Sequence, residues 1–376
     1  MKYDFDSITD RSGTYALKWD VPDNELPMWV ADMDFETPPF IRKALEDRLK
    51  HPIFGYTIAP EDYWQSIISW QQYLHGWEIR REWLTYIPGI VKGIGLAIIH
   101  FTGKSDPVII QPPVYHPFRM VTENNGRIVQ NNPLIWDGIR YQMDLNHLED
   151  VLKRRRCPLL ILSNPHNPGG CMWNKETLAD LARICYKYNV TVISAEAQAD
   201  MQLFGNRHIP VTTVSQEAAQ VGIVFGAPSK TVNIAGLVRS FAVIENPQLT
   251  KCFYGFLHAN ELDDPTLVAT VATHAAYTQG KEWHRQMLDY VENNIDYVVT
   301  QLPRLIPMIK VARPEASFLV WLDCRELKKA GIEDIPGFFT GAGLALNDGA
   351  MFGPGGEGFM RLNAGCPKAI LEHALE

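Results

Sequence analysis

Residues 222–231 have the sequence GIVFGAPSKT, in which an apolar run, Gly222 to Gly226, leads directly into a loop that contains Lys230. A continuous apolar run of this length predicts a strand that is buried on both faces of a sheet. In open α/β sheets, ligands bind at the carboxyl ends of such strands. A lysine partly withdrawn from water there loses its proton more easily and becomes nucleophilic, so Lys230 is a candidate for covalent bonding to a carbonyl compound. An ordinary solvated loop lysine is the alternative that this stretch leaves open.

Similar short runs lie on both sides of this strand. They are Leu84 to Ile87, Pro107 to Gln111, Arg127 to Gln130, Leu159 to Ser163, Val190 to Ser194 and Ser240 to Ile244. Helical patterns separate them, as in Lys175 to Tyr188, where apolar residues recur at helical spacing behind the N-cap residue Asn174. This alternation from about residue 85 to 245 predicts an α/β fold with a mostly parallel sheet covered by helices on both faces.

After residue 280 the pattern changes to a long helix, Trp283 to Leu305, and a pair of strands, Ile309 to Val311 and Ser317 to Leu322. A chain of 376 residues also exceeds what one hydrophobic core usually serves. We therefore expect a large domain at 46–284. The smaller α+β domain is predicted to comprise 1–45 and 285–376, with the N-terminal segment along the cleft between the domains.

Composition and charge exclude several classes of function. The chain has a net charge of −8 and a pI near 5.8, so at neutral pH it would repel a phosphate backbone. Nucleic acid is therefore not an expected partner. The first residues, MKYDFDSITD, lack the apolar core of a secretory signal, and no stretch approaches the ~18 apolar residues of a membrane span. We expect a cytoplasmic protein with no membrane contact. The cysteines and histidines show no ligand spacing, so no metal is predicted.

Two loops add candidate binding groups. SNPHNPGG, from Ser163 to Gly170, is made rigid by two prolines and exposes asparagine amides, of which Asn167 could donate a hydrogen bond to a ligand oxygen. PGIVKG, from Pro88 to Gly93, leads from a strand into a helix and presents free backbone N–H groups to an anion such as phosphate. Taken alone, each loop is equally consistent with a turn that binds nothing.

Taken together, these segments match one family along nearly the whole chain. The matching segments are KWD (18–20), LPMWVADMDF (26–35), FGYT (54–57), QPPVYHPF (111–118), the SNPHNPGG loop, APSKTVNIAGL (227–237) and RLN (361–363). The sequence resembles the class I/II aminotransferase family of pyridoxal-phosphate enzymes with fold type I. Within that family it is most similar to the cystathionine β-lyase-like carbon–sulfur lyases, for which the 26–35 segment is the most specific.

The resemblance implies how the cofactor, pyridoxal 5′-phosphate, is bound. Lys230 would bond to it covalently and transfer protons, Tyr115 would stack on its pyridine ring, and Asn167 would hydrogen-bond the phenolic oxygen. The phosphate would be held by the backbone of Val91 and Lys92 and by Ser229. Tyr56 resembles the tyrosine that reaches the phosphate of the neighbouring subunit, which implies a homodimer with shared active sites.

The resemblance also implies a small amino-acid substrate. Arg361 would bind its carboxylate through two hydrogen bonds, a geometry for which guanidinium is suited. Val30 and Ala31 would lie beside that carboxylate. The expected reaction is α,β-elimination from cystathionine or an L-cysteine conjugate, giving a thiol, pyruvate and ammonia. Transamination on the same fold is an alternative, because a fold does not choose the reaction.

One segment departs from the family pattern. Where the family has Ser-Asp-Glu-Ile-His, this chain has Ser194, Ala195, Glu196, Ala197 and Gln198. The missing aspartate normally keeps the pyridine nitrogen protonated, so that negative charge on the substrate can spread into the ring. Alanine cannot do so, and Glu196 is expected to point to the opposite face of the sheet. Gln198 can hydrogen-bond near the phenolic oxygen but supplies no charge. A weakened activity is therefore predicted, and a non-catalytic regulatory protein that binds pyridoxal phosphate is the alternative from another class.

Overall fold

The computed structural model describes residues 2–237 and 239–376. The α-helices are α1 (Pro39–Leu49), α2 (Glu61–His75), α3 (Ile90–Phe101), α4 (Pro117–Asn124), α5 (Leu145–Arg154), α6 (Lys175–Lys187), α7 (Gln216–Val221), α8 (Pro247–Ala259), α9 (Leu267–Gln279), α10 (Lys281–Leu305), α11 (Ile335–Gly341) and α12 (Lys368–Leu375). The strands are β1 (Leu26–Pro27), β2 (Leu84–Ile87), β3 (Pro107–Ile110), β4 (Ile128–Asn131), β5 (Ile135–Trp136), β6 (Tyr141–Gln142), β7 (Leu159–Ser163), β8 (Thr191–Ala195), β9 (Gly222–Gly226), β10 (Ser240–Val243), β11 (Lys310–Ala312), β12 (Leu319–Asp323), β13 (Leu344–Ala345), β14 (Asn347–Asp348) and β15 (Phe359–Asn363).

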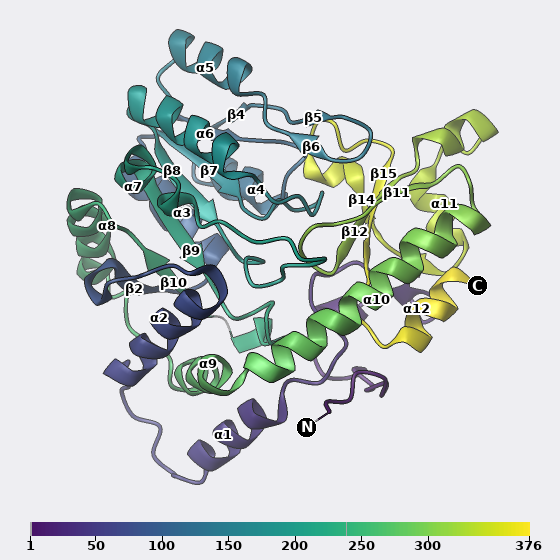
Figure 1. Cartoon of the computed structure of the whole chain (residues 1–376), viewed down its shortest axis with the longest axis horizontal. Coiled ribbons are helices and arrows are strands. Elements are labelled where there is room, and N and C mark those ends of the chain that lie inside the picture. The colour runs from purple at the N-terminus through teal and green to yellow at the C-terminus, as the bar shows by residue number, and fades with distance from the viewer. Residues whose placement is uncertain (1, 238) are drawn as a thin grey trace.

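A large sheet with the strand order β2-β10-β9-β8-β7-β3-β4 forms the centre of the molecule (Figure 1). Neighbouring strands from β9 to β4 are parallel, whereas β10 is antiparallel to both β9 and β2. The predicted mostly parallel sheet is therefore confirmed. The predicted bounds of β2, β7 and β9 are also confirmed. Strands β3 and β10 each end one residue before the predicted end, and β4 and β8 are each shifted by one residue toward the C-terminus.

Helices cover both faces of this sheet, and β7 shows why. Its residues Leu159 and Ile161 belong to a core that includes Ile98 of α3. The alternate residues Leu160 and Leu162 belong to a second core with Leu178 and Leu181 of α6. Because consecutive side chains of a strand point to opposite faces, a continuous apolar strand requires a helical layer on each side. Helix α6 begins as predicted at Lys175, behind the N-cap residue Asn174, whose side chain accepts a hydrogen bond of 2.7 Å from the backbone N–H of Thr177.

A smaller antiparallel sheet, β11-β12-β15-β14, packs with α10 in a third core. The N-terminal segment contributes Phe5, Met28 and Met33 to this core. It also follows the edge of β15, where the backbone N–H of Asn363 donates a hydrogen bond of 2.9 Å to the carbonyl of Met28. The smaller α+β part of the predicted fold is thus confirmed, while the residue boundaries of the two domains stay a prediction. Among the described residues, no helix has both the length and the apolar character needed to cross a membrane.

Candidate active site

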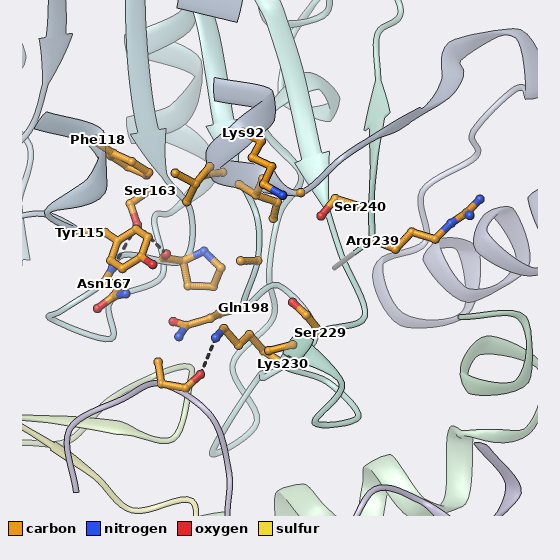
Figure 2. A pocket seen from close by; sticks show the side chains of 18 of the residues that line it. Lys92, Tyr115, Phe118, Ser163, Asn167, Gln198, Ser229, Lys230, Arg239 and Ser240 are labelled. Carbon is orange, nitrogen blue, oxygen red and sulfur yellow. Dashed lines mark hydrogen bonds between the residues drawn. The ribbon is translucent and has the colours of Figure 1, made fainter. Parts of the chain in front are cut away.

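A cavity of about 260 Å³ opens at the carboxyl ends of the parallel strands (Figure 2). Most of the predicted site residues line it, namely Ala31, Val91, Lys92, Tyr115, Asn167, Gln198, Ser229 and Lys230. They come from the N-terminal segment, the start of α3, the loop before α4, and the loops after β7, β8 and β9. Residues that are far apart in sequence thus meet at the carboxyl ends of the parallel strands, where ligands bind in open α/β sheets.

Lys230 extends from the loop after β9 into this cavity, where its ammonium group donates a hydrogen bond to the backbone carbonyl of Ala31 (Figure 2). Desolvation lowers the pKa of Lys230 to about 8; the carboxylate of Asp32 opposes this shift and Arg361 adds to it. With that pKa, about a tenth of the side chain is the neutral, nucleophilic amine at pH 7. At pH 7 the neutral fraction of a lysine with an unperturbed pKa would be several hundred times smaller.

The backbone beside Lys230 is fixed by a buried carboxylate that the sequence did not reveal. The hydroxyl of Thr231 donates a hydrogen bond of 2.8 Å to Oδ2 of Asp200. The same carboxylate accepts a hydrogen bond of 2.9 Å from the indole N–H of Trp70, and Nε2 of His75 lies 3.1 Å from its other oxygen. Because Trp70 and His75 belong to α2, Asp200 connects the segment that carries Lys230 to that helix.

Asn167 and Tyr115 form one wall of the cavity (Figure 2). The backbone N–H of Tyr115 donates a hydrogen bond of 3.0 Å to the carbonyl of Asn167, and the backbone N–H of Asn167 donates one of 3.1 Å to the hydroxyl of Ser163. These contacts hold the aromatic ring and the amide side by side. Burial raises the pKa of the Tyr115 phenol, although the nearby Arg361 guanidinium opposes the shift, so the ring stays neutral at ordinary pH.

Arg361 is a buried cation at the edge of the site. Its Nη1 donates a hydrogen bond of 2.9 Å to Oδ1 of Asn167, and its Nη2 donates to the carbonyl of Trp29 at 3.0 Å and to Oδ1 of Asn347 at 2.6 Å. Its Nε has no hydrogen-bond partner, and among the described residues no carboxylate pairs with this guanidinium. Burial lowers its pKa to about 10. A buried guanidinium without an anionic partner favours the binding of a carboxylate.

The described lining of the cavity has no acidic group. Ala195 and Phe118 line it, and no Asp or Glu is among the described residues that do so. Glu196 points to the other face of the sheet, as predicted, where it accepts hydrogen bonds from Ser194 and Val211 and lies 2.7 Å from Nε2 of His208. Oε1 of Gln198 is buried without a partner, which leaves an acceptor free for a ligand.

The start of α3 provides an anion site. The backbone N–H of Gly93 makes the first helical hydrogen bond, to the carbonyl of Gly89 at 2.8 Å, so the N–H groups of the preceding turn, Val91 and Lys92 included, have no partner within the helix. Gly89 adopts φ +116°, a conformation that favours glycine and lets the chain turn sharply from β2 into α3. The side chains of Ser229 and Ser240 also line the cavity.

Tyr56 does not line the cavity of its own chain. It is fully exposed in the connection between α1 and α2, at the periphery of the molecule (Figure 1). The same connection exposes the apolar side chains of Ile53, Phe54 and Ile58. Val30 does not line the cavity either, but it neighbours Ala31, and its carbonyl accepts a hydrogen bond of 2.6 Å from the side chain of Asn363.

Among the lining residues to which sequence reasoning gave no role in the site are Phe118, Arg239 and Ser240. Phe118 had a usable signal, because it follows Tyr115 by three residues at the start of a helix and therefore lies on the same side. The positions of the other two depend on the antiparallel direction of β10, for which the sequence gave no indication.

Comparison with known proteins agrees with this geometry. The family model for aminotransferase class I and II matches residues 26–376, and the chain belongs to this family. It is 39% identical over 377 residues to cystathionine beta-lyase PatB of Bacillus subtilis (strain 168), covering 99% of this chain and 97% of the relative.

Two solved structures extend the comparison. A PLP-bound putative aminotransferase from Clostridium difficile 630 superposes with a TM-score of 0.95 and 38% identity, covering 100% of this chain and 98% of that one. The PLP-bound C-S lyase from Staphylococcus hominis superposes with a TM-score of 0.93 and 30% identity, covering 100% and 97% of the two chains. The fold is therefore that of fold type I.

Proposed function

We propose that this chain is a pyridoxal-phosphate-dependent carbon–sulfur lyase that acts on cystathionine or an L-cysteine conjugate. The observation that supports it most directly is Lys230, whose amine has a pKa near 8 and lies in the same cavity as Tyr115 and Asn167, next to the unpaired cation Arg361. The relatives that share this fold over nearly their whole length include a cystathionine beta-lyase and a C-S lyase.

The residues present fit the cofactor. Free N–H groups at the start of α3 and the hydroxyl of Ser229 suit its phosphate, and the ring of Tyr115 suits its aromatic face. The free acceptor of Gln198 and the amide of Asn167 suit the polar substituents of the ring. When bound, pyridoxal phosphate would spread the negative charge that forms at the substrate's α carbon.

The chain's own groups would act as follows. Arg361 binds the substrate carboxylate and thereby places the α carbon in front of Lys230. The neutral amine of Lys230 would take the proton from that carbon as general base. The bond from Cβ to sulfur would then break with its electron pair on sulfur, and the proton held by Lys230 would pass to that sulfur, which leaves as a thiol. Water would convert the remaining three-carbon fragment into pyruvate and ammonia.

We further propose a homodimer in which Tyr56 contributes to the partner's site. Its complete exposure, together with that of Phe54 and Ile58, supports this arrangement, because a cluster of apolar side chains in water is typical of a surface that binds another protein. A cytoplasmic location stays a prediction from the sequence.

Ala195 favours one rival function, a regulatory protein that binds pyridoxal phosphate without catalysis. No acidic side chain replaces the missing carboxylate among the described residues that line the cavity. Transamination is supported by the likeness to a PLP-bound putative aminotransferase, but by no side chain among the described residues that line the cavity.

A titration separates the lyase from the binding protein. The purified protein would be titrated with L-cystathionine while its visible absorbance and the release of pyruvate are followed, with Lys230→Ala as the control. A lyase changes its spectrum and releases pyruvate in proportion to enzyme. A spectrum that stays unchanged, with no pyruvate above the control, would leave the binding protein as the function.

A further inference from the structure

We infer that the side-chain ammonium of Lys92 is the cation that binds the cofactor's phosphate in this chain. This inference rests on the proposed function and deepens it, because the family resemblance implied only the backbone of Lys92. Lys92 is the third residue of α3, and its side chain lines the cavity. Figure 2 shows it directed along the wall toward Ser240.

The ammonium of Lys92 is free to bind an anion. Lys92 is exposed, and among the described residues it has neither an ion pair nor a hydrogen bond, whereas the exposed lysines Lys43 and Lys187 pair with Asp47 and Glu149 at 3.0 and 2.7 Å. No acidic side chain of the described cavity lining competes for it. A lysine in the first turn of a helix, in a cavity that two serines also line and without an acidic partner, has the surroundings of a phosphate-binding group.

The other cations of the cavity are less suited to this task. Arg239 donates from Nε to the hydroxyl of Tyr63 and from Nη1 to that of Thr270, each at 2.6 Å. Its guanidinium also lies 4.1 Å from the centre of the Tyr63 ring. One of its nitrogens, Nη2, has no partner, but the side chain points away from the cavity (Figure 2). Lys230 is needed for the covalent bond to the cofactor.

Charge balance shows why a cation is required. A phosphate monoester has a charge of about −1.5 to −2 at pH 7. A helix N-terminus offsets roughly half a unit of charge, and serine hydroxyls offset none. One ammonium group therefore supplies more positive charge than the rest of the phosphate site on this chain. A hydrogen bond to an ionised acceptor is also about twice as strong as a neutral one.

The test compares two ligands that differ only in the phosphate. Dissociation constants of pyridoxal 5′-phosphate and of pyridoxal would be measured by fluorescence on the cofactor-free wild type, Lys92→Gln, Lys92→Arg and Lys104→Gln. Lys104 is an exposed lysine just beyond the other end of α3, so it is a matched control for the loss of one positive charge. As a second measurement, inorganic phosphate would be added and the shift in the thermal unfolding midpoint recorded for each protein.

We expect Lys92→Gln to weaken binding of pyridoxal phosphate by about tenfold, the loss of one charge-assisted hydrogen bond. Binding of pyridoxal should not change, Lys92→Arg and Lys104→Gln should behave like the wild type, and inorganic phosphate should stabilise Lys92→Gln less than the wild type. The inference is wrong if Lys92→Gln binds pyridoxal phosphate as the wild type does, or if both ligands weaken equally. A wild type that binds neither ligand would contradict the proposed function itself, and the inference with it.

Discussion

The guanidinium of Arg361 and the amide of Asn167 are joined by a hydrogen bond of 2.9 Å, from Nη1 to Oδ1. Arg361 belongs to β15 of the smaller sheet, whereas Asn167 lies in the loop after β7 of the large one. The group proposed to bind the substrate carboxylate is therefore connected directly to the group proposed to bind the cofactor's phenolic oxygen. A change at either residue should affect the orientation of the other.

Arg361→Lys should lower kcat/KM for L-cystathionine by about a hundredfold, because lysine keeps the charge but cannot form two parallel hydrogen bonds with a carboxylate. The matched substrate is an amine thioether that lacks the carboxylate. Its slow turnover should be the same in the wild type and the variant. An equal loss for both substrates would mean that Arg361 shapes the site rather than binding the carboxylate.

Lys230→Ala should abolish covalent attachment of the cofactor while non-covalent binding persists through the phosphate and ring contacts. The measurement is borohydride reduction of the loaded protein followed by peptide mapping, with Lys175→Ala as an exposed control. The label should appear in the peptide that contains Lys230 and be absent from the variant. A label on any other lysine would overturn the proposed site.

The pKa of Lys230 predicts how cofactor uptake depends on pH. The folded-state pKa of about 8 lies below the ordinary value for lysine, so the neutral amine forms at lower pH than in an exposed lysine. The rate of covalent attachment should rise about tenfold per pH unit below pH 8 and level off above it. Asp32 raises this pKa, so Asp32→Asn should move the midpoint to lower pH. Stopped-flow absorbance would show both effects, and a midpoint near 10 would contradict them.

Shared active sites predict complementation between two defective variants. Tyr56→Ala and Lys230→Ala should each be poorly active alone. In mixed dimers, one site combines the intact Lys230 of one chain with the intact Tyr56 of the other. After mixing and reassociation, activity should recover to about a quarter of the wild type, because half of the dimers are mixed and each has one complete site. Light scattering that shows a monomer with full cofactor affinity would rule out this arrangement.

Ala195→Asp, alone or with Gln198→His, should raise β-elimination from L-cystathionine by at least about tenfold, because a carboxylate there would keep the pyridine nitrogen protonated. Cofactor affinity should change less, since the phosphate and ring contacts are unaffected. Pyruvate release and pyridoxal phosphate dissociation constants would be measured for the same proteins. If the unmodified protein already turns over as fast as the substituted ones, the chemistry does not need this carboxylate.

Local sequence patterns predicted much of the fold because each buried strand is apolar on both faces. Leu159 to Ser163 and Gly222 to Gly226 have the bounds that this reasoning gave. The opposite orientation of Glu196 from Ala195 also followed from strand geometry alone, and its hydrogen bonds to Ser194 and Val211 agree with it.

What sequence reasoning missed depends on contacts between distant segments. Ser240 begins β10, and in an antiparallel strand the amino end lies at the edge where the parallel strands finish. A rule based on carboxyl ends therefore could not find it. Asp200 is likewise far in sequence from Trp70 and His75, and no spacing along the chain indicates that they meet.

The hydrogen bond between Thr231 and Asp200 holds the main chain beside Lys230 in place, while the side chain of Lys230 stays movable. The main chain is attached to α2 through Asp200, whereas among the described residues the ammonium of Lys230 is hydrogen-bonded to the Ala31 carbonyl alone. Bonding to the cofactor would then require rotation about the side-chain bonds of one residue. Lys230 would therefore be able to bond to the cofactor and to be released from it without a rearrangement of the backbone at this position.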